Sequence, residues 1–194
     1  MKEKLVLIGN GMAGIRTIEE LLKLAPELYD ITVFGAEPHG NYNRILLSPV
    51  LAGEKSVDDI MLNDEAWYAE NGITLHKGKT VTEINRARRV VTATDKDGHV
   101  TEAPYDRLLM ATGSDPVILP VPGHDLPGVV TFRDMADVER MIEATKKHAH
   151  GVVIGGGLLG LEAANGLMKQ GMHVTVVHLE ETLMERQIDA EAGA

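Results

Sequence analysis

The sequence predicts an α/β fold in which two β-α-β units flank an antiparallel meander. Within residues 5–34, an apolar strand, a glycine turn, an amphipathic helix and a second apolar strand follow one another, and the same order returns within residues 151–177. Short segments rich in β-branched residues lie between these two units. Because a helix between two strands normally packs back on a parallel sheet, each unit predicts part of an open, doubly wound sheet.

The first unit begins with an apolar strand at residues 5–8, followed by a turn with three glycines at residues 9–14. Apolar residues then recur at helical spacing, and Pro26 ends that helix. The β-branched segment 31–34 is the second strand, which closes just before Glu37.

The middle of the chain predicts one short helix and several short strands. Asn63 is a suitable N-cap for a helix through Trp67 and Tyr68 that ends at Gly72. The turn at residues 95–98, with the sequence Asp-Lys-Asp-Gly, favours a hairpin. The expected strands of this region are residues 81–84, 90–94, 100–102 and 108–111.

Proline and glycine concentrate at residues 116–128, which predicts a linker. The expected division is a first domain at 1–117, a linker at 118–130 and a second domain at 131–194. The elements expected after the linker are a helix at 137–147, a strand at 151–154, a glycine turn at 155–160, a helix at 161–170 and a strand at 174–177.

Composition excludes several classes of function. The formal net charge of −10 has the wrong sign for neutralising phosphates, so we expect no nucleic-acid partner. The chain has no cysteine, which excludes disulfides, iron–sulfur ligands and cysteine nucleophiles within this segment. No run of 18 apolar residues occurs, so we expect neither a signal peptide nor a membrane span. We therefore expect a cytoplasmic location.

The first glycine turn has the spacing of a dinucleotide site. Gly9, Gly11 and Gly14 follow a strand and open a helix, where backbone N–H groups and the positive end of the helix can meet a pyrophosphate. Glu37, just beyond the second strand, can accept hydrogen bonds from ribose hydroxyls. The alternative is a turn that serves packing only, with Glu37 as a solvated loop acid.

The second glycine turn repeats this setting with Gly155, Gly157 and Gly160. His178 stands where a ribose-binding acid is expected, so the sequence chooses neither NADH nor NADPH. Two such turns predict two dinucleotides, a nicotinamide and a second redox dinucleotide, most naturally FAD.

At these motifs the sequence also resembles a known family. Residues 9–14, residues 111–113 and residues 155–162 resemble the two-dinucleotide flavoproteins, which include rubredoxin, ferredoxin and nitrite reductases. Residues 41–49 and 183–189 resemble the N-terminal part of the large subunits of assimilatory NAD(P)H nitrite reductases.

The resemblance implies a Rossmann-like FAD domain with an antiparallel β-meander insertion, followed by an incomplete second Rossmann-like NAD(P) domain. The residues that it assigns to FAD are Gly9, Gly11, Met12, Ala13, Gly14, Glu37, Asn43, Arg44, Ser48, Val81, Ala111, Thr112 and Gly113. Those that it assigns to NAD(P)H are Gly155, Gly157, Leu158, Leu159, Gly160, Glu162 and His178.

Some of these residues have an equally simple structural interpretation. By the resemblance, Arg44 binds a phosphate of FAD and Val81 contacts the adenine. Arg44 is equally typical of a surface ion pair, and Val81 is equally typical of the core side of a strand. Glu162, the catalytic candidate, would lie near the nicotinamide and the flavin. The alternative for Glu162 is a favourable acid in the first turn of its helix.

Departures from the family pattern narrow the prediction. Pro49 stands where ferredoxin-reductase relatives often carry a lysine beside the flavin, so lysine-tuned flavin chemistry is not expected. The missing cysteines exclude the disulfide-reductase branch. We expect the chain to be the electron-entry part of a longer protein. Iron–sulfur and sirohaem centres would then lie downstream in the same chain or in a small subunit.

Three further expectations follow from the residues. The same residues could belong to a rubredoxin or ferredoxin reductase, or to a nucleotide-binding fragment without turnover. His148 and His150 have no third ligand in sight, so no metal site is expected. Apolar surface on an incomplete second sheet favours pairing with a second copy as a homodimer.

Overall fold

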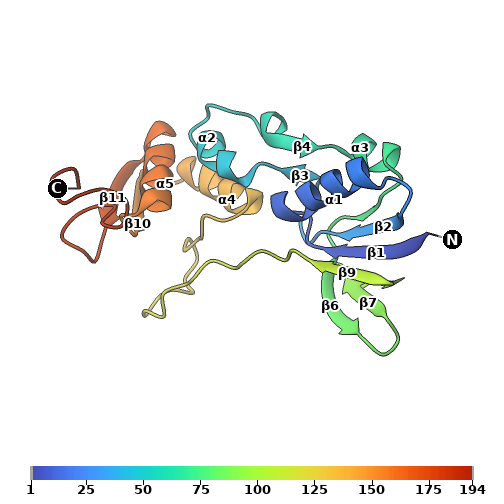
Figure 1. Ribbon diagram of the computed structural model, residues 1–194. Coiled ribbons are helices and arrows are strands. Elements are labelled where there is room, and N and C mark those ends of the chain that lie inside the picture. The colour runs from blue at the N-terminus through green and yellow to red at the C-terminus, as the bar shows by residue number, and fades with distance from the viewer. Residues whose placement is uncertain (1, 194) are drawn as a thin grey trace. The chain divides into compact units, whose positions relative to one another are not determined.

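The computed structural model describes residues 2–193, which form two compact units (Figure 1). The first unit takes in the described residues of Met1–Asn43 and Met61–Ser114, and the second takes in those of Arg44–Ile60 and Asp115–Ala194. Residues 44–60 therefore group with the second unit, although they lie between two parts of the first. The domain limits expected from the sequence stay a prediction.

The main sheet of the first unit is parallel and has the strand order β5-β2-β1-β9. β1 (Glu3–Ile8) lies between β2 (Tyr29–Phe34) and β9 (Arg107–Met110), and β5 (Thr74–His76) pairs with β2. The helix α1 (Met12–Leu24) connects β1 to β2, which confirms the first β-α-β unit.

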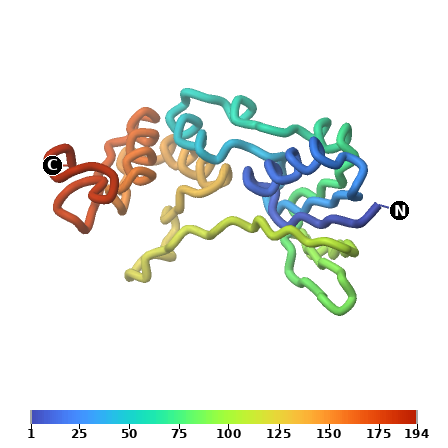
Figure 2. Tube along the Cα trace, viewed as in Figure 1, coloured from blue at the N-terminus to red at the C-terminus, as the bar shows by residue number. Residues whose placement is uncertain are grey.

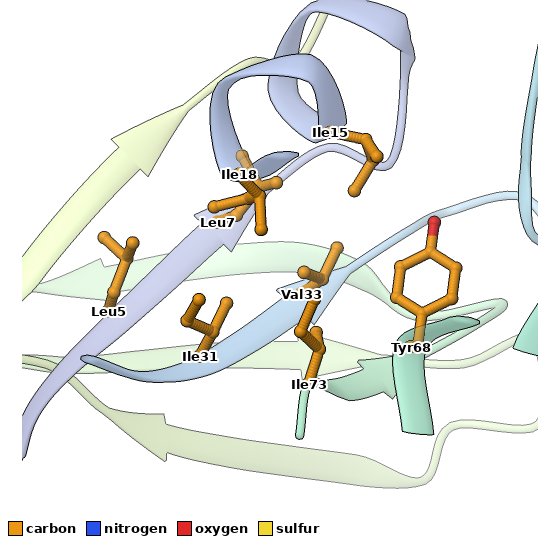
Figure 3. Close-up of a cluster of buried hydrophobic side chains, with 8 residues drawn as sticks. All are labelled: Leu5, Leu7, Ile15, Ile18, Ile31, Val33, Tyr68 and Ile73. Carbon is orange, nitrogen blue, oxygen red and sulfur yellow. The ribbon is translucent and has the colours of Figure 1, made fainter. Parts of the chain in front are cut away.

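Both faces of this sheet are buried. Successive side chains of a strand point to opposite faces, so β1 contributes to two separate cores. One core lies between the sheet and α1 (Figure 3), and its buried members are Leu5, Leu7, Ile15, Ile18, Ile31, Val33, Tyr68 and Ile73. The other core consists of Val6, Ile8, Phe34, Val91, Ala93 and Ala103. Each valine, leucine, isoleucine or phenylalanine side chain of these cores contributes about 1.5–3 kcal/mol when fully buried.

An antiparallel sheet of three strands supplies the second core. Its order is β6 (Thr80–Asn85), β7 (Val90–Thr94) and β8 (Val100–Pro104). β7 and β8 form a hairpin around residues 95–98, where Gly98 has a φ of 84°. The three strands lie where the sequence predicts a meander.

A small antiparallel pair joins β3 (Asn41–Tyr42) and β4 (Met61–Asn63), ahead of the helix α3 (Glu65–Glu70). The predicted cap of α3 was wrong by one residue. Asp64, not Asn63, accepts the capping hydrogen bond from the Trp67 N–H at 2.9 Å. Asn63 is instead the last residue of β4, so the N-cap moves to the next polar residue.

The second unit contains the second β-α-β arrangement. β10 (His150–Ile154) and β11 (His173–Val177) pair in parallel and are connected by α5 (Leu158–Lys169), as predicted. The helix α5 begins at residue 158 rather than 161, directly after its N-cap Gly157. Glu162 therefore lies in the second turn of α5, and the expectation of a first-turn acid was wrong.

The segment 44–60 and the helix α4 (Met135–Thr145) complete the second unit. The segment consists of η1 (Arg44–Leu46), α2 (Leu47–Leu51) and η2 (Asp58–Ile60), and α2 packs against α4 and α5.

Between β9 and α4 the chain forms neither helix nor strand, as Figure 2 traces in yellow. Among residues 2–193, no helix combines the length and the apolar character that are needed to cross a membrane.

Candidate functional site

The first glycine turn is held tightly against the chain that follows β9. Gly9 has a φ of +109°, and a Cβ at this position would lie 2.1 Å from the carbonyl oxygen of Ala111. At Gly14, a Cβ would lie 3.0 Å from the carbonyl oxygen of Gly9. Packing and backbone conformation therefore require glycine at position 9, and tight packing disfavours a side chain at position 14.

Gly11 differs from these two glycines. It has an ordinary φ of −84°, and a Cβ there would meet no protein atom within 4 Å. Neither strain nor packing explains a glycine at this position. A ligand that must approach the backbone closely does explain it, and this is the requirement of a pyrophosphate at such a turn.

The start of α1 also suits an anion. Gly11 is the N-cap of α1, no side chain caps the helix, and its first turn contains no acid. By contrast, Asp64 caps α3 and Asp134 caps α4. The N–H groups in the first turn of α1, at Met12, Ala13 and Gly14, have no acceptor within the helix. Together with the helix dipole, they fit a phosphate.

A polar network fixes the middle of this turn. Asn10 accepts at Oδ1 from the Tyr68 hydroxyl at 2.7 Å, and its carbonyl accepts from the Asn41 amide at 3.0 Å. The Asn10 amide donates to the carbonyl of His39 at 3.3 Å. Burial raises the pKa of Tyr68 to about 12, which keeps its hydroxyl protonated as a donor. Sequence reasoning missed this network, because no spacing rule connects residue 10 with residues 41 and 68.

Glu37 lies beyond the carboxyl end of β2. Its Oε2 accepts a hydrogen bond from the Tyr42 hydroxyl at 2.8 Å, and His39 Nε2 lies 3.4 Å from the same oxygen. Two neighbouring side chains thus contact the partly exposed carboxylate of Glu37.

The chain that follows β9 lies against the first turn. The Ala111 N–H donates to the carbonyl of Ile8 at 2.8 Å, and a Cβ at Gly9 would lie 3.2 Å from the nitrogen of Thr112. Gly113 follows with a φ of 74°.

The side chain of Val81 packs against the core that contains Val6 and Phe34. The structure thus gives Val81 the strand-core role, while contact of its backbone with adenine stays a prediction.

The second glycine turn repeats the geometry of the first. Gly155 has a φ of +118°, and a Cβ at Gly160 would lie 2.0 Å from the carbonyl oxygen of Gly155. Gly157 corresponds to Gly11, since it is the uncapped N-cap of α5 and a Cβ there would meet nothing within 4 Å. Leu158 and Leu159 begin α5 and are largely exposed.

His178 follows β11 and contacts this turn directly. The Gly156 N–H donates to His178 Nδ1 at 3.0 Å, and His178 Nε2 lies 3.3 Å from Glu185 Oε2. Because Nδ1 accepts a hydrogen bond, the proton of the neutral ring is on Nε2, where it faces the Glu185 carboxylate.

Glu162 has a partner within the second unit. The Ser48 hydroxyl on α2 donates to Glu162 Oε2 at 2.5 Å. The Arg44 guanidinium donates to the carbonyl of Arg133, also at 2.5 Å. The structure thus brings Ser48 and Glu162 together, and it places Arg44 against a main-chain carbonyl of the same unit. Asn43 is the last residue of the first of the two chain segments that make up the first unit.

Within the described part of the chain, one group of three side chains could offer metal ligands: Asp95, Asp97 and His99. The Lys79 ammonium lies 2.8 Å from Asp95 Oδ2 and, with the His99 backbone N–H, holds the pKa of Asp95 well below its usual range. A cationic side chain thus already faces this hairpin turn, and we assign the group to the stability of the hairpin.

The sequence of this chain is similar to those of known proteins. A family profile described as pyridine nucleotide-disulphide oxidoreductase matches residues 3–194. The nitrite reductase [NAD(P)H] of Bacillus subtilis is 55% identical over 99% of this chain, which covers 23% of that protein. The assimilatory nitrate reductase electron transfer subunit of the same organism is 50% identical over 99% of this chain and 24% of its own length.

Among solved structures, an NAD-dependent persulfide reductase from A. fulgidus aligns with a TM-score of 0.88 and 30% identity. This alignment covers 97% of the present chain and 36% of the reductase. The chain thus spans about a quarter of the length of the two curated relatives and about a third of the solved one.

Proposed function

Because the chain belongs to the pyridine nucleotide-disulphide oxidoreductase family, we propose that it is the part of an oxidoreductase that receives electrons from NAD(P)H. The observation that carries this proposal is the pair Gly11 and Gly157. At both positions the protein itself leaves room for a side chain, yet the sequence has glycine at the start of an uncapped helix.

We assign FAD to the first turn and NAD(P)H to the second. At the first turn, the N–H groups that follow Gly11 hold the pyrophosphate and Glu37 accepts from the adenosine ribose. At the second turn, the N–H groups that follow Gly157 hold the pyrophosphate of the nicotinamide dinucleotide. When both are bound, the nicotinamide supplies a hydride and the flavin supplies the means to release its electrons one at a time.

Glu162 is the catalytic candidate in this proposal. Glu162 lies in the second turn of α5, and the Ser48 hydroxyl donates a hydrogen bond to its carboxylate. The carboxylate is therefore oriented before any dinucleotide binds. The role of Ser48 is to hold that carboxylate. Arg44 and Asn43 remain proposed contacts of FAD.

We further propose that the electrons finally reduce nitrite. The 55% identity to a nitrite reductase [NAD(P)H] supports this acceptor. The chain has no cysteine, so the iron–sulfur and sirohaem centres of such a reaction would be bound by another part of a longer protein or by a small subunit. We also propose a cytoplasmic location, where NAD(P)H is available as the electron source.

A second candidate has support of its own. The 50% identity to a nitrate reductase electron transfer subunit favours a protein that passes its electrons to a separate reductase, as rubredoxin and ferredoxin reductases do. Steady-state assays of the full-length protein with NADH and either nitrite alone or an added acceptor protein distinguish the two candidates.

The visible absorption spectrum of the purified chain, after addition of FAD and removal of the excess, tests the proposal. We expect a bound flavin spectrum that is bleached by anaerobic addition of NADH. Gly157→Ala is the matched control, because it should retain the flavin spectrum and lose the bleaching by NADH. A full-length protein that keeps no flavin, or whose bound flavin is bleached by neither NADH nor NADPH, contradicts the proposal.

Apolar side chains on the second sheet support pairing with a second copy. Val152 and Ile154 on β10 are 66% and 64% exposed, and Val177 on β11 is 50% exposed. We propose that this surface is covered by self-association. Sedimentation should show a species larger than one chain, and a single monomeric species over a wide concentration range would contradict it.

A further inference from the structure

The carboxylate of Glu37 is held by a buried tyrosine that no dinucleotide-binding pattern includes. The Tyr42 hydroxyl donates to Glu37 Oε2 at 2.8 Å. Tyr42 is only 5% exposed, whereas the side chain of Glu37 is 32% exposed. The donor is thus fixed inside the protein and the acceptor reaches toward solvent.

Tyr42 is itself well fixed. It lies on β3 and pairs with Met61 of β4. The ring of His39 packs edge-on against the Tyr42 ring, with centroids 5.2 Å apart and an interplanar angle of 74°. His39 Nε2 also approaches Glu37 Oε2, so two rings converge on one carboxylate oxygen.

The neighbouring residue of β3 supports the glycine turn. Asn41, which is 1% exposed, donates to the carbonyl of Asn10 at 3.0 Å. Consecutive residues of one two-residue strand therefore contact the two parts of the first dinucleotide site. Asn41 holds the turn that receives the pyrophosphate, and Tyr42 holds the acid that receives the ribose.

We infer that Tyr42 is a positioning residue for ribose recognition, and that its hydroxyl orients the Glu37 carboxylate toward the vicinal hydroxyls of the adenosine ribose. This inference rests on the proposed assignment of FAD to the first turn. A glutamate on a loop has several rotamers, and ordering them on binding weakens affinity. A fixed tyrosine hydroxyl removes most of that cost before the ligand arrives.

The test compares FAD with an FAD analogue whose adenosine carries 2′,3′-dideoxyribose. Flavin fluorescence of the 194-residue chain gives both dissociation constants. For the wild type we expect FAD to bind about tenfold more tightly than the analogue, since the lost hydrogen bonds involve a charged acceptor. In Tyr42→Phe this preference should fall to about twofold, through weaker binding of FAD rather than tighter binding of the analogue.

Two variants make the result specific. Tyr29→Phe removes a hydroxyl at the amino end of β2 and should leave the preference at its wild-type value. In Glu37→Gln the preference should already be lost, and adding Tyr42→Phe should change it no further, because Tyr42 acts through Glu37. A merely structural loss would weaken both ligands equally and leave their ratio unchanged.

The possible outcomes distinguish a failure of the inference about Tyr42 from a failure of the proposed assignment of FAD to the first turn. A wild-type chain that binds neither ligand contradicts the FAD assignment and the inference with it. A wild type that prefers FAD, together with a Tyr42→Phe variant that keeps the full preference, overturns the inference alone.

Discussion

The Tyr68 hydroxyl donates to Asn10 Oδ1 at 2.7 Å and thereby ties helix α3 to the middle of the first glycine turn. The two residues are 58 positions apart in the sequence. Tyr68 is also one of the largest fully buried side chains, and its ring belongs to the core beneath α1. One residue thus links the apolar core to the candidate site.

Removing this hydroxyl should destabilise the protein. Tyr68→Phe keeps the ring but leaves the partly buried Asn10 oxygen without its donor, which should lower the free energy of unfolding by about 1–2 kcal/mol. Urea denaturation followed by circular dichroism measures the change. Tyr29→Phe is the matched control and should stay within about 0.5 kcal/mol of the wild type. Equal stability of the Tyr68→Phe variant and the wild type would contradict the role of this hydrogen bond.

The same tyrosine predicts a loss of stability at alkaline pH. Burial raises the pKa of Tyr68 from 10 to about 12 in the folded protein. Above pH 10 the unfolded state therefore loses a proton that the folded state retains, so the free energy of unfolding should fall as the pH rises from 10 to 12. The Tyr68→Phe variant should lack this part of the decline. If the free energies of unfolding of the variant and the wild type differed by the same amount from pH 10 to pH 12, the prediction would be contradicted.

His76 predicts the opposite dependence at acidic pH. It stacks on Phe34 with ring centroids 4.8 Å apart, and burial, with Lys79 nearby, lowers the pKa of His76 from its ordinary value of 6.5. Below pH 6.5 the unfolded state binds a proton more readily than the folded state, so stability should fall as the pH decreases. Thermal unfolding of His76→Gln should show a weaker dependence over this range. His148→Gln, at an exposed position, should keep the wild-type dependence.

Two glycines of the first turn should respond in opposite ways to alanine. Gly11→Ala should fold with a stability within about 1 kcal/mol of the wild type, because its Cβ meets no protein atom, yet it should bind FAD at least tenfold more weakly. Gly9→Ala should lose several kcal/mol, since its Cβ would overlap the Ala111 carbonyl and its φ is positive. Calorimetry and FAD titration give both quantities. Full FAD affinity of Gly11→Ala would show that the turn serves packing only.

Ser48→Ala tests the orientation of Glu162. The variant removes the 2.5 Å hydrogen bond but leaves the carboxylate in place, so we expect the flavin of the full-length protein to be reduced by NADH about tenfold more slowly. Rapid mixing under anaerobic conditions measures this rate. Ser48→Thr retains a hydroxyl and should therefore keep most of the wild-type rate of flavin reduction. An unchanged rate in Ser48→Ala would remove Ser48 from the proposed mechanism.

Long periodic segments were the predictable part of the fold. Both β-α-β units and the hairpin around residues 95–98 follow from alternation, helical spacing and glycine position. The strands β3, β4 and β5 have two or three residues each, too few for any period to be visible. The helix α2 has five residues and contains Pro49, which its first turn tolerates because an N–H there has no partner within the helix.

The same limit applies to the candidate site. The glycine spacing and Glu37 are local signals, so the sequence could predict them. The partners Tyr42, Tyr68 and Ser48 depend on how distant segments pack, which no local pattern contains. Asn63 and Asp64 are adjacent and equally suited as caps, so only the pairing of β4 decides between them.

The grouping of residues 44–60 with α4 and α5 bears on synthesis at the ribosome. Gln170, the C-cap of α5, donates to the carbonyl of Leu51 at 2.9 Å, so the two interacting segments are made about 120 residues apart. At roughly 5–20 residues per second, α2 remains without its contacts to α5 for about 6 to 24 seconds after it leaves the exit tunnel. During that interval Leu47, Val50 and Leu51, which are buried in the folded protein, lack the cover that α5 later provides, so the second unit cannot be completed until α5 has been made.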